Sequence, residues 1–302
     1  MRPNFFIVGA AKSGTTSLWR YMKQHPDVFF PDNKEPNFFA YEAEISQSIC
    51  GPADPEVLLK KLHSLTVTSF DVYQDLFRNA SSAKAVGEAS VRYLYFPQAC
   101  ERIFQSLPDS KIIIILRNPV NRLYSHFLMM KGMYSLEPLS LSEALEQEES
   151  RISAKWDWDW HYVQVSMYFD QVRRYLETFG SSNVRVFVYE EFCQSPLQVV
   201  QEIFRFLDVD DNFVPDMSAR SMQAYWPRST NIDQALRSPN RINSAMRNIL
   251  PTSTYARLVK YGMRLNKGKP PRMPNEMREQ LSMTFQQDVV KLEHLLGRKL
   301  PW

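Results

Sequence analysis

A strand–loop–helix pattern early in the chain limits what this sequence can fold into more than any other feature. Phe5–Val8 is an unbroken apolar run, which is typical of a β-strand covered on both faces. Gly9 and Gly14 bracket the loop that follows, and glycine lets the backbone approach a ligand closely. Thr15–Ser17 then begins a helix, whose first N–H groups and positive dipole end favour an anion. With Lys12 inside the loop, the pattern predicts a phosphate-binding loop.

Strand-like and helix-like segments alternate along the chain. The strongest strand signal is Lys111–Leu116, a β-branched and apolar run that is typical of a central parallel strand. Ala85–Glu88 and Val184–Tyr189 are further predicted strands. Helices are predicted at Thr15–Gln24, Pro55–His63, Phe70–Phe77, Pro97–Leu107, from Pro119 with Asn118 as its cap, Val163–Thr178, Pro196–Leu207 and Asn275–Leu296, and residues 209–240 are expected to be irregular. This alternation predicts an α/β fold: a single P-loop-NTPase-like domain over residues 1–302, with a central parallel β-sheet flanked by helices.

Composition and cysteine usage argue against several other classes of protein. The formal net charge is only +3 at pH 7, without the basic stripe of a nucleic-acid-binding protein. Cys50, Cys100 and Cys193 are far apart and form no C-x-x-C pair, so neither a metal site nor a disulfide framework is expected. No apolar run approaches the ~20 residues that span a bilayer, and no signal segment precedes Phe5. We therefore expect a cytoplasmic protein that binds neither nucleic acid nor a membrane.

The spacing of the loop departs from the common NTPase pattern G-x-x-x-x-G-K-[ST]. Lys12 precedes the second glycine instead of following it. This arrangement resembles the 5′-phosphosulfate-binding loop of sulfotransferases that use 3′-phosphoadenosine 5′-phosphosulfate (PAPS), above all the heparan-sulfate sulfotransferases and their bacterial relatives. The resemblance implies that PAPS binds here and leaves as 3′-phosphoadenosine 5′-phosphate (PAP). The loop residues implied in binding are Lys12, Ser13, Gly14, Thr15, Thr16 and Ser17.

Two further motifs carry the same resemblance. Arg117 follows a predicted strand, and Ser125 lies eight residues later in the next helix, as in the family's 3′-phosphate-binding motif. The guanidinium fork matches phosphate oxygens, and ligands of open α/β sheets bind beyond the carboxyl ends of strands. Lys267, Gly268 and Lys269 resemble the family's loop that closes over the nucleotide, although Lys269 stands where arginine is common.

Two residues are candidates for the catalytic chemistry. Glu35 stands just before the aromatic pair Phe38–Phe39. The family's general base is a glutamate in this context, so the resemblance implies that Glu35 removes the acceptor's proton. Lys12 is expected to stabilise the charge on the leaving phosphate oxygen. The cytosolic small-molecule branch uses histidine as its base, which makes His126 and His161 rivals, although neither lies in that branch's sequence context.

The acceptor is the least constrained partner. Heparan-type members often carry a lysine directly after the glutamate of the second strand, whereas this chain has Glu88-Ala89-Ser90. That difference favours a hydroxyl or amine of a small molecule over a long sulfated glycan; a carbohydrate acceptor is the alternative. Residues 155–162, with alternating Trp and Asp, either cover the core or form a wall for a cationic acceptor. The candidate acceptor-binding residues are Glu88, Trp156, Trp158, His161 and Tyr168, the last of which either touches ligand or packs in the core.

Two other classes of protein fit the sequence less well. A P-loop kinase with ATP and Mg²⁺ is disfavoured by the loop spacing and by the lack of a convincing strand-terminal aspartate for the metal. A non-catalytic nucleotide-binding module is disfavoured because both Lys12 and Glu35 are present.

Overall fold

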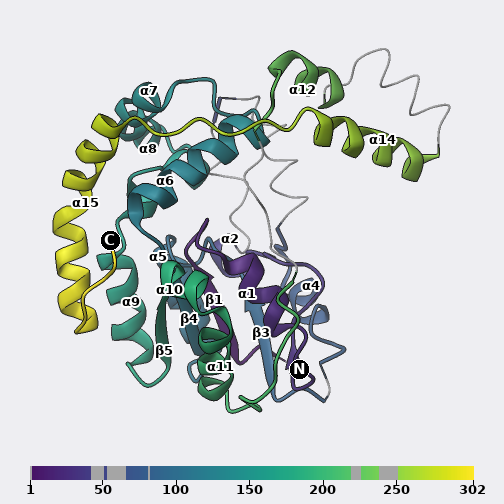
Figure 1. Cartoon of the computed structure of the whole chain (residues 1–302). Helices are drawn as coiled ribbons and strands as arrows, with labels where there is room; N and C mark the ends of the chain where they lie inside the picture. The colour runs from purple at the N-terminus through teal and green to yellow at the C-terminus, as the bar shows by residue number, and fades with distance from the viewer. Residues whose placement is uncertain (1, 42–50, 53–65, 81, 219–225, 238–250) are drawn as a thin grey trace.

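The computed structural model describes residues 2–41, 51–52, 66–80, 82–218, 226–237 and 251–302. Its centre is a parallel sheet of five strands in the order β2-β3-β1-β4-β5. The strands are β1 (Phe5–Gly9), β2 (Val28–Phe29), β3 (Ala85–Ala89), β4 (Lys111–Leu116) and β5 (Val184–Val188). The α/β fold with a central parallel sheet is thereby confirmed. Since β1 is the middle strand, the loop that follows it opens at the centre of one sheet edge (Figure 1).

Helices cover both faces of the sheet (Figure 1). One face packs against α1 (Thr15–Met22) and α11 (Pro196–Phe206). The other packs against α5 (Pro97–Ser106), α9 (Phe169–Phe179) and two short helices, α2 (Phe38–Tyr41) and α4 (Phe70–Asp75). Successive side chains of β4 alternate between these two cores because strand residues point to opposite faces in turn. The unbroken apolar run of β4 is therefore what a strand covered on both faces requires.

A third apolar cluster lies beyond the carboxyl ends of the strands, where α6 (Pro119–Leu128) crosses the molecule (Figure 1). It joins α6 to the N-terminal half of α15 (Asn275–Leu296) and to the segment around Trp160 and Tyr162. The remaining elements are η2 (Met129–Met133), α7 (Leu141–Glu146), α8 (Glu148–Ser153), η3 (Trp158–Trp160), η4 (Gln164–Ser166), α10 (Tyr189–Gln194), α12 (Thr230–Arg237) and α14 (Thr252–Leu265). Of these elements, η2 reaches the loop that follows β1, where Met129 contacts Lys12.

Several predicted boundaries were wrong. The helix expected from Val163 begins at Phe169, because Glu148 accepts hydrogen bonds from the backbone N–H groups of Val163 and Gln164 and holds a separate 3₁₀ turn there. Residues 209–240, expected to be irregular, contain α12. The helix predicted at residues 55–63 lies outside the described residues. Among the described helices, none combines the length and apolarity needed to cross a membrane.

Candidate active site

The loop between β1 and α1 has the geometry of an anion cradle. Gly14 adopts a φ of 86°, and a Cβ atom there would lie 2.9 Å from ring atoms of Tyr189, so this position requires glycine. Ser13 is buried, and its Oγ has no hydrogen-bond partner among the described residues. Thr15 begins α1 directly after Gly14. The backbone N–H groups of this first turn therefore face the loop, where they favour an anion.

Arg117 lies against this loop although it is 105 positions away in the sequence. Its Nη1 donates a hydrogen bond of 3.0 Å to the backbone carbonyl of Lys12, and its guanidinium lies 4.8 Å from the ring centre of Tyr189. The Nε of Arg117 is buried without a partner among the described residues. Tyr168 is also buried and donates from its hydroxyl to the carbonyl of Arg117 at 3.0 Å. The structure thus joins the two predicted phosphate-binding groups and places Tyr168 beneath them.

The amine of Lys12 sits in an environment that disfavours its charge. Its Nζ lies 3.4 Å from Sδ of Met129, the first residue of η2. The pKa of Lys12 is lowered from 10.5 to about 8. Burial is the largest cause, and the positive charge of Arg117 is the next. The nearby carboxylate of Glu35 acts in the opposite direction. An anion bound beside Lys12 would offset both unfavourable causes.

Glu35 is fixed on a strained loop at the carboxyl end of β3. Its φ is 67°, and that of Asn37 is 54°, which for non-glycine residues is uncommon and is often found at functional sites. The backbone N–H of Glu35 donates to the carbonyl of Ala89 at 3.0 Å, and Nδ2 of Asn37 donates to the carbonyl of Glu35 at 2.7 Å. The carboxylate remains about a third exposed, at 35%, and pairs with Lys34. Both predicted catalytic residues therefore have φ near +67° and lie near each other.

Glu88 lies beneath this loop and not on its open side. The side chain is fully buried, and its carboxylate accepts hydrogen bonds from Tyr73 at 2.5 Å and from Ser90 at 2.6 Å. Burial raises the pKa of Glu88 from 4.5 to about 7. Ser90 in turn accepts from the backbone N–H of Asn37 at 3.1 Å. This placement offers the acceptor no direct contact with Glu88 and makes the residue a support of the loop that carries Glu35.

Residues 155–162, here called the Trp/Asp segment, contain two aspartates that bind Arg92. Asp157 accepts from Nη1 of Arg92 at 2.9 Å, and Asp159 lies 3.4 Å from Nη2. The guanidinium also lies 4.9 Å from the ring centre of Trp158, and Trp158 belongs to the same buried cluster as Ala11 of the phosphate-binding loop. This segment therefore reaches the site through Trp158 and Asp159, while Asp157 is committed to a buried ion pair.

The other predicted members of the segment lie elsewhere. Trp156 packs on Arg151 and Trp160, at 4.8 and 5.6 Å between centres, in the cluster under α6. His161 is buried, and its Nδ1 lies 2.8 Å from the hydroxyl of Tyr95. Trp158 therefore packs against the phosphate-binding loop, whereas Trp156 packs in the core under α6.

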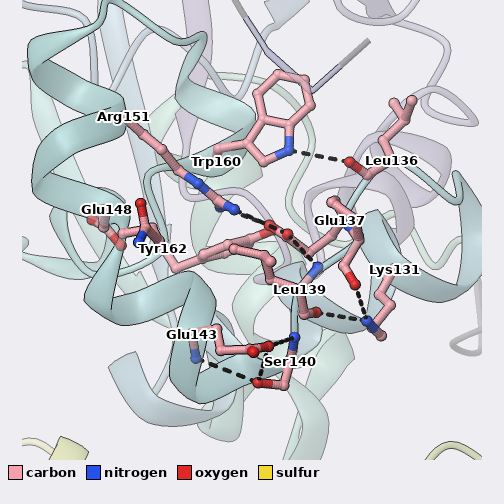
Figure 2. Close-up of polar contacts among 12 residues, drawn as sticks. Lys131, Leu136, Glu137, Leu139, Ser140, Glu143, Glu148, Arg151, Trp160 and Tyr162 are labelled. Atoms are coloured by element: carbon pink, nitrogen blue, oxygen red, sulfur yellow. Dashed lines mark hydrogen bonds and ion pairs between the residues drawn. The ribbon is translucent and has the colours of Figure 1, made fainter.

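A buried ion pair anchors the end of the Trp/Asp segment (Figure 2). Glu137 and Arg151 make two contacts of 2.7 and 3.1 Å, and the hydroxyl of Tyr162 donates to the same carboxylate at 2.8 Å. Nε1 of Trp160 donates to the carbonyl of Leu136 at 3.4 Å (Figure 2). These bonds hold residues 158–162 rigidly against the loop that follows η2.

Tyr134, which directly follows η2, lies near Glu35 and was not predicted from the sequence. Burial is the main cause that raises the pKa of its hydroxyl, and the carboxylates of Asp159 and Glu35 contribute next. Both carboxylates therefore lie within electrostatic range of this hydroxyl. The fold thus brings Glu35 and Asp159, which are far apart in the sequence, near one tyrosine.

Ser125 and the Lys267–Lys269 loop lie at the same end of the molecule. Ser125 is half-buried on α6. The neighbouring Tyr124 donates from its hydroxyl to the carbonyl of Pro271 at 2.8 Å, which ties α6 to the segment that crosses above it from α14 to α15 (Figure 1). Within that segment the backbone N–H of Gly268 donates to the carbonyl of Trp226 at 2.7 Å. Lys267 is half-buried and Lys269 is exposed.

Arg122 and His126 form a buried polar network on α6, and no sequence signal pointed to Arg122. Arg122 donates to Oγ of Ser166 at 2.6 Å, to the carbonyl of Tyr162 at 2.7 Å and to Nδ1 of His126 at 3.0 Å. The pKa of His126 is well below its ordinary value, mainly because the ring is buried and secondly because Arg122 is positively charged. His126 is therefore neutral, and this network argues against it as the general base.

Glu190, also missed in the sequence, supports the start of α6. One of its carboxylate oxygens accepts from the backbone N–H of Asn118 at 3.1 Å, and the other accepts from Nε1 of Trp302 at 3.0 Å. Asn118 itself caps α6 as predicted, since its side chain accepts from the N–H of Asn121 at 3.1 Å. These bonds fix the backbone directly after Arg117.

Fold and site together define an α/β protein whose central loop and adjacent arginine are arranged for a phosphate-bearing ligand. Residues 2–293 match the sulfotransferase domain family, and the chain belongs to that family. A solved sulfotransferase from Alicyclobacillus acidocaldarius is 35% identical and superposes with a TM-score of 0.76, with 99% of this chain and 98% of that one covered. The expected family and transferase class are confirmed.

Curated relatives match more distantly and in part. Human heparan sulfate glucosamine 3-O-sulfotransferase 6 is 24% identical over 211 residues, which are 68% of this chain and 52% of that protein. Human carbohydrate sulfotransferase 15 is 28% identical over 152 residues, which are 42% of this chain and 27% of that protein. The chain thus spans about half or less of the length of these relatives.

Proposed function

We propose that this protein transfers a sulfuryl group from PAPS to a hydroxyl or amine of a small-molecule acceptor and releases PAP. The observation that carries the proposal is that Arg117 donates a hydrogen bond to the backbone of the loop that contains Lys12. Ser13 Oγ and Arg117 Nε are buried there without partners among the described residues. A ligand that bears phosphate at the 3′ and 5′ positions of one ribose would bind both cations and satisfy both buried polar atoms.

The residues present fit such a ligand. The 5′ end would be held by the first turn of α1 and by Lys12, Ser13, Gly14, Thr15, Thr16 and Ser17. The 3′-phosphate would be bound by Arg117 and Ser125, and the Lys267–Lys269 loop would close over the nucleotide from the segment above α6 (Figure 1). Tyr168 supports Arg117 through its backbone carbonyl.

Lys12 and Glu35 divide the chemistry between them. Bound PAPS supplies a sulfur–oxygen–phosphorus bridge: the sulfur–oxygen bond of the bridge breaks, a bond forms from sulfur to the acceptor, and the bridging oxygen stays on PAP. Lys12 would donate a hydrogen bond to that oxygen as its charge develops, an effect worth about 3–4 kcal/mol for comparable donors. Glu35 would accept the proton that the acceptor loses. The two groups lie near enough for the carboxylate of Glu35 to act on the pKa of the Lys12 amine.

The acceptor class follows from the surroundings of Glu35. Asp159 and Glu35 both act on the hydroxyl of Tyr134, and Trp158 packs against Ala11 of the phosphate-binding loop. This mixture of aromatic and carboxylate groups would suit a small polar acceptor. A carbohydrate acceptor is the second candidate, since two relatives are by name a heparan sulfate and a carbohydrate sulfotransferase.

A binding experiment tests the proposal. We expect the purified protein to bind PAP more tightly than ATP, by isothermal titration calorimetry, whether or not Mg²⁺ is present. A preference for ATP that requires Mg²⁺ would instead support a kinase. Incubation with ³⁵S-labelled PAPS and matched panels of alcohols, amines and sugars then identifies the acceptor.

A further inference from the structure

Two buried N–H groups close to Lys12 have no hydrogen-bond partner among the described residues. They are Nε2 of His126 and Nε1 of Trp158, and the two rings are neighbours, with centres 5.5 Å apart. A buried polar group left without a partner costs about 1–3 kcal/mol, and such groups in folded proteins call for an explanation. Two of them side by side indicate a shared ligand.

The network around Arg122 fixes which nitrogen of His126 carries the proton. A guanidinium can only donate hydrogen bonds, so Nδ1 of His126 must accept the 3.0 Å bond from Arg122. The neutral ring therefore carries its proton on Nε2. Arg122 is itself held by Ser166 and by the carbonyl of Tyr162, and the Tyr162 hydroxyl is bound by Glu137 (Figure 2). The Nε2–H donor is thus rigidly oriented.

Both rings lie near the loop that carries Lys12. His126 precedes Met129 by three residues, which places the two side chains on one face of the α6–η2 helix. Sδ of Met129 lies 3.4 Å from Nζ of Lys12. Trp158 packs in one cluster with Ala11, which directly precedes Lys12. The two rings therefore lie beside the loop that would hold the 5′ end of the nucleotide.

The charges around His126 favour an anionic oxygen. Four groups from different elements act on the ring, and each disfavours its protonation; they are Arg122, Lys12, Arg92 and His161. The nearest carboxylate is that of Asp159, whose Oδ1 lies 4.0 Å from Nε2 and whose Oδ2 lies beside Arg92. The positive potential at this point suits the oxygens of a transferring sulfuryl group.

We propose that His126 and Trp158 bind the sulfuryl oxygens of PAPS, His126 through Nε2–H and Trp158 through Nε1–H. This inference rests on the proposed function. Neither donor can take the acceptor's proton, since both nitrogens already carry one, so proton removal stays with Glu35. The pair would hold the sulfur between the leaving oxygen and the acceptor, and would stabilise it more strongly as its oxygens gain charge.

Comparison of PAPS with PAP isolates this contact, because PAP lacks the sulfuryl group. The Kd of each is measured by calorimetry in the absence of acceptor for wild type, His126→Phe, His126→Gln and Trp158→Phe. We expect the Phe variants to weaken PAPS binding about fivefold, as for the loss of one hydrogen bond, with the Kd of PAP within about twofold of wild type. Glutamine presents an acceptor and an N–H in place of the two ring nitrogens, so His126→Gln should restore most of the PAPS affinity.

Trp156→Phe is the matched control, because Trp156 belongs to the same segment but packs on Arg151. It should leave both dissociation constants unchanged. If the ratio of the PAPS and PAP dissociation constants is the same in both Phe variants as in wild type, the inference is overturned. A wild-type protein that binds neither nucleotide would overturn the proposed function instead. Should His126→Phe fail to fold, Trp158→Phe, which keeps a ring beside Arg92, decides the matter alone.

Discussion

The lowered pKa of Lys12 predicts that the affinity of the protein for PAP depends on pH. Burial and Arg117 lower the pKa of its amine from 10.5 to about 8. A bound phosphate dianion opposes both causes, and we take the bound pKa to return to its ordinary value. Above pH 8 the free protein must then take up a proton to bind PAP, so the Kd should rise about 20-fold between about pH 7.5 and about pH 9.5. The phosphates of PAP, with a second pKa of about 6, do not titrate in this range.

Calorimetry in two buffers of different ionisation enthalpy measures the proton uptake directly. At about pH 8.5 we expect uptake of about 0.75 proton per PAP bound, from the same two pKa values. Lys12→Met should bind PAP weakly, and Lys12→Arg, which stays charged, should bind without uptake. If wild type shows no uptake, or if Lys12→Met shows the same uptake, the assignment of this pKa to Lys12 is refuted.

Two further substitutions test the loop that carries Glu35. Glu35→Gln should lower kcat by about 10²–10⁴-fold and leave the PAP Kd within about twofold; turnover close to wild type would remove Glu35 from the mechanism. Glu88 binds its proton more tightly in the folded state, since burial raises its pKa from 4.5 to about 7. Its contribution to stability is therefore full below pH 4.5 and is lost as the pH rises through 7, a change of roughly 3 kcal/mol. Glu88→Gln should remove this dependence, as measured by urea unfolding at acidic and at mildly alkaline pH; an unchanged pH slope would contradict the assignment.

Local signals in the sequence were sufficient for the centre of the fold. β1 and β4 were predicted because their apolar runs satisfy two buried faces at once. The start of α6 was predicted because Asn118 and Pro119 occupy positions that helix N-termini favour. The start of α9 was predicted wrongly, since the buried carboxylate of Glu148 claims the backbone N–H groups that a longer helix would have used.

The site was predictable only in its separate pieces. The sequence by itself determined the loop around Lys12, the strand-terminal Arg117 and the place of Glu35 before its aromatic pair, because each signal lies within a few residues. Tertiary structure alone decided that Arg117 binds the Lys12 carbonyl and that Trp158 faces the loop while Trp156 faces the core. It also decided that burial, and after it the charge of Arg122, lowers the pKa of His126. These outcomes depend on burial and on contacts between residues far apart in the chain, for which local periodicity carries no signal.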